Sequence, residues 1–275
     1  MVNLFTWRVA FTSFVMMLTS AFVAEASCGG QPGACKIAGG SYHIAFPAGY
    51  DASKNLPAVV ALHSWGASGA GLLSSGKMVK KLLARGYVVV APEGLSRTDG
   101  AGGTWEFMGG ARRNDAAFIV SVANDAAKRF GLNRGHMLLA GFSVGGSMVH
   151  YTACKFPGSF RGFAPQSGNF WKPYPGSCGG GANILHTHGR TDNTMPFAGR
   201  KVGPGLQQGS LQTAMDIWSR ANGCTPEPLQ TTGSGITRQK WSGCSRGSLA
   251  IDYVPGGHSV PGPWADRVIT WFQSL

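Results

Sequence analysis

Charged residues are scarce in this chain of 275 residues: Asp, Glu, Lys and Arg make up 13% of it, against 43% hydrophobic residues. This composition excludes intrinsic disorder and a coiled coil, since both are rich in charge. Glycine is abundant, with 42 residues, but it follows no Gly-X-Y period, so a collagen helix is excluded too. The length is enough for one large domain or two small ones with a substantial core.

Acidic residues are especially few, with 12 Asp and Glu against 24 Lys and Arg, which leaves a net charge of +12. No run of basic residues is longer than a pair such as Lys80-Lys81 or Arg112-Arg113, and no helix-turn-helix or zinc-finger pattern appears. We therefore expect no nucleic-acid partner. The charge indicates a basic soluble surface, or an attraction to acidic substrates and anionic polymers.

Long apolar runs are missing except near the start, where Arg8 precedes an apolar stretch of about 16 residues, 9–24. That is short of the roughly 20 residues that cross a bilayer. Ala24-Glu25-Ala26 then forms an A-x-A cleavage signal. These features predict a signal peptide at residues 1–26, a secreted mature chain (extracellular or periplasmic), and no stable membrane insertion after cleavage.

The chain has no C-x-x-C motif, so neither a zinc knuckle nor a thioredoxin-like site is indicated. All six cysteines follow the predicted cleavage site, in the compartment where disulfides form. Six cysteines allow 15 pairings. Order along the chain favours three short loops: Cys28 with Cys35, Cys154 with Cys178, and Cys224 with Cys244.

Apolar runs alternate with segments of helical periodicity along most of the chain. The expected strands are 57–63, 87–91, 136–142, 160–164, 183–188 and 249–254. The expected helices are 72–83, 114–130, 144–156, 208–221 and 264–272. Such alternation predicts an α/β fold, a mostly parallel sheet with helices on both faces. No internal repeat or Pro/Ser-rich linker divides the chain, so we expect one domain over 27–275.

Two segments match the G-x-S-x-G pattern of a serine nucleophile, one around Ser143 and one around Ser245. The pattern alone is weak, because the chain is rich in glycine and serine. A nucleophile elbow also needs a strand before the serine and a helix after it. Ser143 has both, whereas Ser245 precedes an expected strand. Ser143 is therefore the candidate nucleophile, with an N-capping serine in a glycine-rich turn as the structural alternative.

A serine hydroxyl needs a base and an orienting acid. His258 lies in a glycine-containing loop after the last expected strand, where it can reach the serine. Asp192 follows the expected strand 183–188, at the sheet edge where such folds place catalytic groups. The order Ser143, Asp192, His258 is that of α/β-hydrolases. The weaker candidates are His150, His186 and His188 for the base, and Asp216 and Asp252 for the acid.

The oxyanion of an ester transition state needs two backbone N–H groups. Val144, directly after the nucleophile, supplies one, and the loop after the strand 57–63 supplies the other, from Trp65 or Ser64. His186 and His188 form an H-x-H pair, but no further ligand set accompanies it. We therefore expect no metal and no cofactor.

The chain resembles the secreted polyhydroxybutyrate depolymerase and feruloyl esterase family. The resemblance rests on the segments ALHSWGASG, NDAAFIVSVANDAAKRFGLNRGHMLLAGFSVGGSM, FAPQSG, HGRTD and GGHSVPG, in this order. It implies an α/β-hydrolase fold and carboxylic ester hydrolysis, with Ser143 as nucleophile, Asp192 as acid and His258 as base. It also supports the second and third cysteine pairs.

The chain departs from the family at two places: Ser64 replaces the glycine of "LHG", and Val260 replaces a tryptophan after the catalytic histidine. The expected function is hydrolysis of hydroxyalkanoate esters, with polyhydroxybutyrate-type oligomers as the partner substrate. The alternatives are a feruloyl or acetyl esterase of plant polysaccharide, an acyltransferase with the same triad, and a non-catalytic binding protein. We expect small or oligomeric esters to be cleaved faster than solid polymer, with Trp264 and Phe142 at the substrate.

Overall fold

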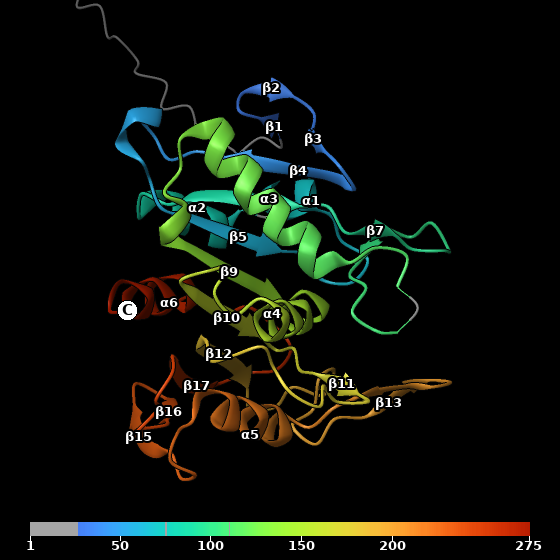
Figure 1. Ribbon diagram of the computed structural model, residues 1–275, viewed down its shortest axis with the longest axis vertical. Coiled ribbons are helices and arrows are strands. Elements are labelled where there is room, and N and C mark those ends of the chain that lie inside the picture. The colour runs from blue at the N-terminus through green and yellow to red at the C-terminus, as the bar shows by residue number, and fades with distance from the viewer. Residues whose placement is uncertain (1–26, 75, 110) are drawn as a thin grey trace, which may run out of the picture.

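A large β-sheet runs through the chain, which we describe from a computed structural model of residues 27–275 without residues 75 and 110 (Figure 1). The predicted signal peptide, residues 1–26, lies outside the described residues. In spatial order the strands are β15 (Leu229–Gly233), β16 (Ile236–Lys240), β17 (Ser248–Val254), β12 (Asn183–Gly189), β10 (Gly162–Gln166), β9 (Met137–Phe142), β5 (Ala58–Leu62), β6 (Val88–Pro92), β4 (Gly40–Ala45), β1 (Ser27–Cys28) and β2 (Gln31–Pro32), with β3 (Cys35–Ile37) paired to β4.

The six central strands, from β17 to β6, run parallel to one another, and the strands outside them pair antiparallel. Strands of a parallel sheet are covered on both faces, so they consist almost wholly of apolar residues. Accordingly, every residue of β5 and β6 is buried. The predicted mostly parallel sheet is confirmed.

Helices cover both faces of this sheet. Helices α3, α4 and α5 share one apolar core, which contains Phe118 and Met148, and α1, α2 and α6 share another, which contains Leu73. Within β5, Val60 faces the first core and Val59 the second, because successive side chains of a strand point to opposite faces. The helices are α1 (Gly69–Ser74), α2 (Lys77–Ala84), α3 (Asp115–Phe130), α4 (Val144–Lys155), α5 (Leu211–Asn222) and α6 (Trp264–Gln273), with short 3₁₀ turns η1 (Ala52–Lys54) and η2 (Arg134–His136).

The ends of α3 follow from its sequence. Asn114 accepts a hydrogen bond from the Ala117 amide at 3.2 Å and so caps the first turn. Gly131 ends the helix at φ 59°, a left-handed conformation that favours glycine, and donates its amide to the Ala127 carbonyl. The predicted helix 114–130 is confirmed.

Two predicted helices differ from those observed. The expected helix 72–83 is divided into α1 and α2, because Gly76 has a φ of 89°, which no α-helix accommodates. The expected helix 208–221 begins only at Leu211. Ser210 caps it, with its hydroxyl accepting from the Thr213 amide at 3.0 Å, and Gln208 belongs to a strand.

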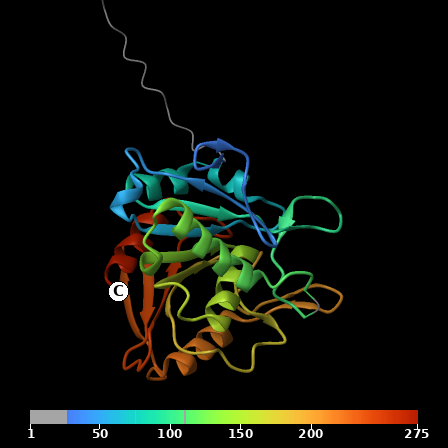
Figure 2. The ribbon, with the colours of Figure 1, turned by 45° about the horizontal axis from the view of Figure 1, so that its top comes forward.

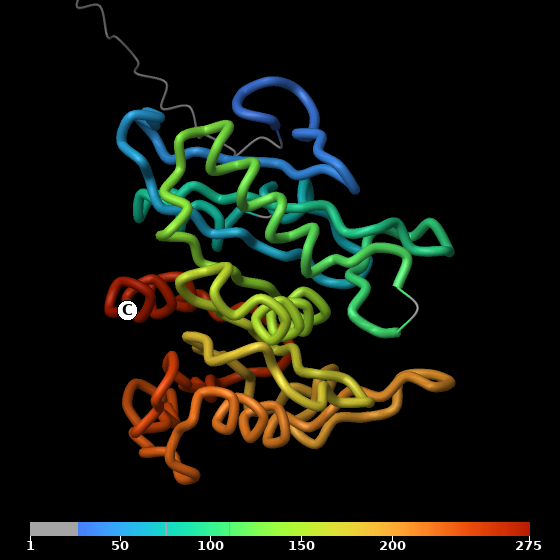
Figure 3. The backbone as a smooth tube through the Cα atoms, in the orientation of Figure 1, coloured from blue at the N-terminus to red at the C-terminus, as the bar shows by residue number. Residues whose placement is uncertain are grey.

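Two small sheets that were not predicted lie beyond the carboxyl ends of the central strands. In Figures 1 and 2 the segments of β7–β8 and β13–β14 project from this same side of the molecule. Figure 3 shows the N-terminal strands (blue) at one end of the molecule and α5 with β15–β17 (orange) at the other. The small sheets consist of β7 (Leu95–Ser96) with β8 (Gly103–Thr104), and of β11 (Trp171–Lys172), β14 (Leu206–Gln208) and β13 (Lys201–Gly203).

Three disulfides join the pairs that order along the chain favours: Cys28–Cys35, Cys154–Cys178 and Cys224–Cys244. The first ties β1 to β3 across a separation of 7 residues. The second ties the end of α4 to the loop before β12, across 24 residues, and the third ties the end of α5 to the segment before β17. None of the six cysteines is free.

The second disulfide is expected to stabilise the fold more than the first. A cross-link restricts the unfolded chain more when it closes a longer loop, so replacing Cys154 and Cys178 together by Ala should lower the free energy of unfolding by about 3 kcal/mol. The matched variant without Cys28 and Cys35 should lose less. Urea unfolding of the three proteins measures this, and a larger loss on removal of the first disulfide would contradict the ordering.

Candidate active site

Ser143 stands at a sharp turn between β9 and α4, as its sequence context predicts. Its φ of 58° and ψ of −122° lie outside the regions that non-glycine residues normally adopt. Such strained backbone persists only where the surroundings enforce it. Here the Ser143 amide donates to the Gln166 carbonyl at the end of β10, at 2.9 Å, and α4 starts at the next residue.

Close backbone contacts explain the glycines around this turn. A Cβ atom on Gly141 would lie 2.4 Å from the Gly145 carbonyl oxygen. One on Gly145 would lie 2.5 Å from the His63 carbonyl oxygen, and one on Gly146 would lie 2.5 Å from that of Gln166. Real Cβ atoms do not approach so closely, so any side chain at these positions would push the turn out of place.

The three side chains singled out in the sequence meet in one line of hydrogen bonds. His258, in the loop after β17, has its Nε2 atom 2.9 Å from Ser143 Oγ. Its Nδ1 atom lies 2.8 Å from Asp192 Oδ2, in the loop after β12. An ionised carboxylate can only accept, so His258 carries its proton on Nδ1 and presents the lone pair of Nε2 to the serine hydroxyl. This is the arrangement in which an imidazole can remove the serine proton.

The Asp192 carboxylate is held ionised. Burial would raise its pKa, but hydrogen bonds from the Met195 amide and from His258 outweigh burial and bring the pKa below 3.8. Its Oδ1 atom accepts from the amides of Met195 at 2.8 Å and Thr194 at 3.0 Å. These two amides, which sequence reasoning did not single out, fix the carboxylate's orientation.

The alternative candidates lie elsewhere. Asp252 is buried in β17 and paired with Arg238 at 2.6 and 2.8 Å, and Asp216 accepts from Gln212 on the exposed face of α5. Ser245 precedes β17, and its hydroxyl donates to the Asn222 carbonyl at 3.4 Å. The three histidines His150, His186 and His188 are buried and contact one another. Among the residues that the structure describes, no group of three or more His, Cys, Asp or Glu could hold a metal ion.

The loop after β5 lies beside the start of α4. Since a carbonyl oxygen only accepts, His63 donates from Nδ1 to the Ser64 carbonyl at 2.8 Å, and its Nε2 accepts from the Gly94 amide at 3.0 Å. In a trans peptide the N–H points opposite to the C=O. The Ser64 carbonyl faces the His63 ring, so the Trp65 amide faces the other way. Trp65's indole is 57% exposed, with the Arg97 guanidinium 3.5 Å from the ring centroid.

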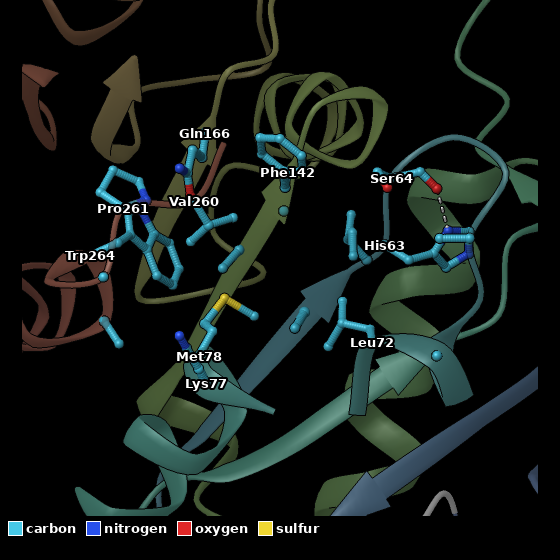
Figure 4. A pocket seen from close by; sticks show the side chains of 18 residues that line it. His63, Ser64, Leu72, Lys77, Met78, Phe142, Gln166, Val260, Pro261 and Trp264 are labelled. Carbon is cyan, nitrogen blue, oxygen red and sulfur yellow. Dashed lines mark hydrogen bonds between the residues drawn. The ribbon is translucent and has the colours of Figure 1, made fainter. Parts of the chain in front are cut away.

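An apolar cavity of about 610 Å³ borders the turn on the side of Phe142 (Figure 4). It lies between the ends of β5 and β9, helices α1 and α2, and the segment after His258. The Phe142 ring centroid is 4.7 Å from that of His258. Trp264 also borders the cavity, although it is only 2% exposed. Other residues that line it are His63, Ser64, Leu72, Lys77, Met78, Gln166, Val260 and Pro261.

The cavity includes residues that sequence reasoning missed. Leu72 and Met78 lie on α1 and α2, and apolar residues at helical spacing indicate only a packed face. Gln166 donates its side-chain amide to the Ser259 carbonyl at 2.9 Å and so fixes the loop that carries His258. A polar residue at the end of a central strand, within FAPQSG, was the signal for this role.

A second hollow, of about 500 Å³, borders the turn on the side of Val144. Ser143 therefore stands between two recesses, one reached past the residue before it and one past the residue after it. An ester has two halves that lie on opposite sides of its carbonyl carbon, and this arrangement offers a place for each. The second hollow is lined chiefly by Trp65, Trp105, Phe107, Met108, Val144, Trp171 and Leu206.

The fold is that of an α/β-hydrolase, as the similarity to solved structures shows. Acetyl xylan esterase from Aspergillus awamori superposes with a TM-score of 0.60 at 17% identity, covering 86% of this chain and 94% of that one. A carboxylesterase from Mesorhizobium loti gives a TM-score of 0.59 at 17% identity, covering 88% and 99%. No family model matches the chain.

Sequence comparison gives relatives with the same kind of chemistry. Feruloyl esterase B of Piromyces equi is 25% identical over 242 residues, which make up 80% of this chain and 42% of that protein. The bifunctional acetylxylan esterase/xylanase XynS20E of Neocallimastix patriciarum is 26% identical over 120 residues, 41% of this chain and 16% of that protein. The chain thus spans less than half the length of either relative. The relatives and structural neighbours are carboxylic ester hydrolases, in agreement with the resemblance seen in the sequence.

Replacing Ser143 tests the elbow against the second G-x-S-x-G match. Ser143→Ala should lower kcat for an ester substrate by at least about 10⁴-fold, because the attacking oxygen is removed. Ser245→Ala, the matched control, should keep kcat within about twofold. Loss of activity in the Ser245 variant with retention in the Ser143 variant would contradict the assignment.

The buried histidines predict a loss of stability in mild acid. Burial lowers the pKa of His150 to about 3, against 6.5 for an ordinary imidazole. Below pH 6.5, His150 therefore binds a proton in the unfolded chain but not in the native state. The free energy of unfolding should fall between pH 7 and pH 5 by about 2 kcal/mol for this residue.

Urea unfolding of wild type and His150→Gln at both pH values measures this. The variant should lose about 2 kcal/mol less than wild type over the same interval, whatever its stability at pH 7. An equal loss in the two proteins would show that His150 becomes protonated in the folded state.

Proposed function

We propose that this protein hydrolyses carboxylic esters through Ser143, His258 and Asp192. The observation that carries the proposal is the line of two hydrogen bonds, 2.9 and 2.8 Å long, from the Ser143 hydroxyl through His258 to the buried Asp192 carboxylate. The serine stands on a strained strand-to-helix turn, as in the nucleophile elbow of α/β-hydrolases. The names of the sequence relatives support the same class of reaction.

The geometry implies the following sequence of steps. Ser143 Oγ attacks the ester carbonyl carbon while His258 Nε2 takes the hydroxyl proton, and Asp192 stabilises the resulting imidazolium. The tetrahedral intermediate collapses, and the leaving alcohol takes the proton from His258. Water then attacks the acyl-enzyme with His258 again as the base, which releases the acid and restores the serine.

The Val144 and Trp65 amides are our candidates for binding the oxyanion. Val144 is the first residue of α4, and the positive end of the helix dipole favours negative charge there. Trp65 follows the peptide whose carbonyl is held toward His63, so its amide is directed away from that ring. The Gly145 contact with the His63 carbonyl places this loop against the start of α4.

For the substrate we propose an ester of a bulky apolar or aromatic acid, with the acyl group in the cavity beside Phe142. An acetyl group is far smaller than about 610 Å³, whereas a hydroxycinnamoyl group is large enough to use that space. The exposed indole of Trp65 borders the hollow on the other side, where a sugar ring can stack on it. A feruloylated polysaccharide is therefore our first proposed substrate, ahead of an acetylated polysaccharide.

Hydroxyalkanoate oligomers, the substrate expected in the sequence analysis, are the second proposed substrate. Their short branched acyl units would leave part of the cavity unfilled. Three disulfides support a site of action outside the cytoplasm. Transfer of the acyl group to an alcohol instead of water would use the same steps, and product analysis with added methanol distinguishes the two.

Narrowing the cavity tests where the acyl group binds. Met78→Trp places a large side chain in the cavity wall, away from Ser143 and His258, so kcat/KM for methyl ferulate should fall about tenfold or more. The same variant should hydrolyse p-nitrophenyl acetate at nearly the wild-type rate, because an acetyl group does not reach the wall. An acetylated xylan and a hydroxybutyrate trimer complete the comparison.

Equal effects on the ferulate and the acetate would contradict the assignment of the cavity. A wild-type preference for the hydroxybutyrate trimer over the ferulate would favour the second substrate class. No turnover of any of these esters, with a folded protein, would contradict the proposed activity itself.

A further inference from the structure

One indole and three imidazoles form a continuous hydrogen-bonded chain inside the protein, between α4, α5 and β12. Trp218 Nε1 lies 2.9 Å from His150 Nδ1, and His150 Nε2 lies 3.1 Å from His186 Nδ1. His186 Nε2 lies 2.9 Å from His188 Nδ1, and His188 Nε2 lies 2.8 Å from the Met195 carbonyl oxygen. All four side chains are completely buried, with exposed fractions of 0%. The steps given above for ester hydrolysis do not use any of them directly.

The groups at the two ends of this hydrogen-bonded chain determine which nitrogen of each imidazole carries the proton. An indole N–H can only donate, and a carbonyl oxygen can only accept. His150 must therefore accept at Nδ1 and donate from Nε2, and the same follows for His186 and then His188. Each imidazole is neutral with its proton on Nε2, and every hydrogen bond points from Trp218 toward Met195.

A proton added to any of these buried imidazoles would leave two N–H groups facing each other. Burial is also the largest cause that lowers the pKa of each of the three histidines. The three imidazoles of this hydrogen-bonded chain therefore stay neutral, and they do not undergo the charge changes that a proton relay would need.

The hydrogen-bonded chain of side chains ends at Met195, on the turn that carries Asp192. Met195 accepts from His188 through its carbonyl and donates from its amide to Asp192 Oδ1 at 2.8 Å. His188 Nε2 also lies 3.5 Å from Asp192 Oδ2, the oxygen that binds His258. The imidazole of His188 thus contacts both the backbone of this turn and its carboxylate.

The geometry points to His188 as a positioning residue for the catalytic acid. By donating to the Met195 carbonyl it fixes the turn 192–195, whose amides hold the Asp192 carboxylate in line with His258. His150, His186 and Trp218 keep His188 in the one tautomer that can donate there. This inference rests on the proposed triad, and it adds a residue that acts on the triad from the interior of the fold.

Two substitutions at one position separate positioning from packing. Glutamine can place an amide N–H where the imidazole Nε2–H was, whereas leucine fills similar space and cannot donate. We expect His188→Leu to lower kcat for p-nitrophenyl acetate at least tenfold with KM changed less than about twofold. His188→Gln should keep most of kcat. Near-UV circular dichroism shows whether each variant is folded.

A second measurement is independent of turnover. In wild type labelled with ¹⁵N-histidine, NMR should show His150, His186 and His188 as neutral Nε2–H tautomers at pH 7. The low-field proton on His258 Nδ1, which marks the hydrogen bond to Asp192, should be lost or displaced in His188→Leu and retained in His188→Gln.

Three results would overturn the inference: an Nδ1–H or charged His188 in wild type, an unchanged His258 proton in the leucine variant, or a folded leucine variant with wild-type kcat. Absence of ester turnover in wild type would instead contradict the proposed function. The tautomers and the His258–Asp192 hydrogen bond would still be read from the spectra.

Discussion

Close contact between backbone segments at Ser143 is the constraint on which the site depends. The serine can hold its unusual φ of 58° only because β5, β10 and α4 approach it without intervening side chains. The same contacts bring the loop after β5, which carries Trp65, against the start of α4, which carries Val144. They also leave the residues on either side of the serine facing two different recesses. The proposed roles of the serine, of the oxyanion-binding amides and of the two recesses thus depend on one packing arrangement.

The histidines near the site share a physical feature: each has fixed partners that decide which nitrogen carries the proton. His63 is held between an amide and a carbonyl, His258 between a carboxylate and a hydroxyl, and His188 between an imidazole and a carbonyl. Of these, only His258 faces a group that exchanges protons in the proposed reaction. The other two hold backbone segments in place. They lower the free energy of unfolding only in acid, where the unfolded chain becomes protonated.

Much of the fold could be predicted from the sequence, because the central strands are parallel and buried on both faces. An apolar run such as β6 has no other stable place, and the helices between such runs must cover the sheet. The candidate triad could be predicted for the same reason, since Asp192 and His258 follow strands whose carboxyl ends meet at one edge. The peripheral strands could not. They are short or polar, and β15–β16 has no apolar alternation to mark it. The division of α1 from α2 depends on the conformation of Gly76, which the periodicity of the neighbouring residues does not reveal.

The histidine chain shows the limit of motif reading more clearly. His186 and His188 form a pair that sequence alone relates to metal binding, but His186 bonds to His150 on α4, 36 residues away, and His150 in turn accepts from Trp218 on α5, 68 residues further along the chain. Only the packing of those helices on β12 turns the pair into a hydrogen-bonded array. Spacing along one strand says which side chains share a face, and it does not say what is packed against that face.

The proposed reaction requires that His258 and Asp192 make Ser143 a nucleophile. Covalent labelling by a fluorophosphonate tests it most directly, because the activated oxygen displaces fluoride and forms a bond to phosphorus. Mass spectrometry of the digested protein then locates the adduct. We expect a single adduct on Ser143 in wild type and none in His258→Ala. An adduct on Ser245, or unimpaired labelling of Ser143 without His258, would contradict it.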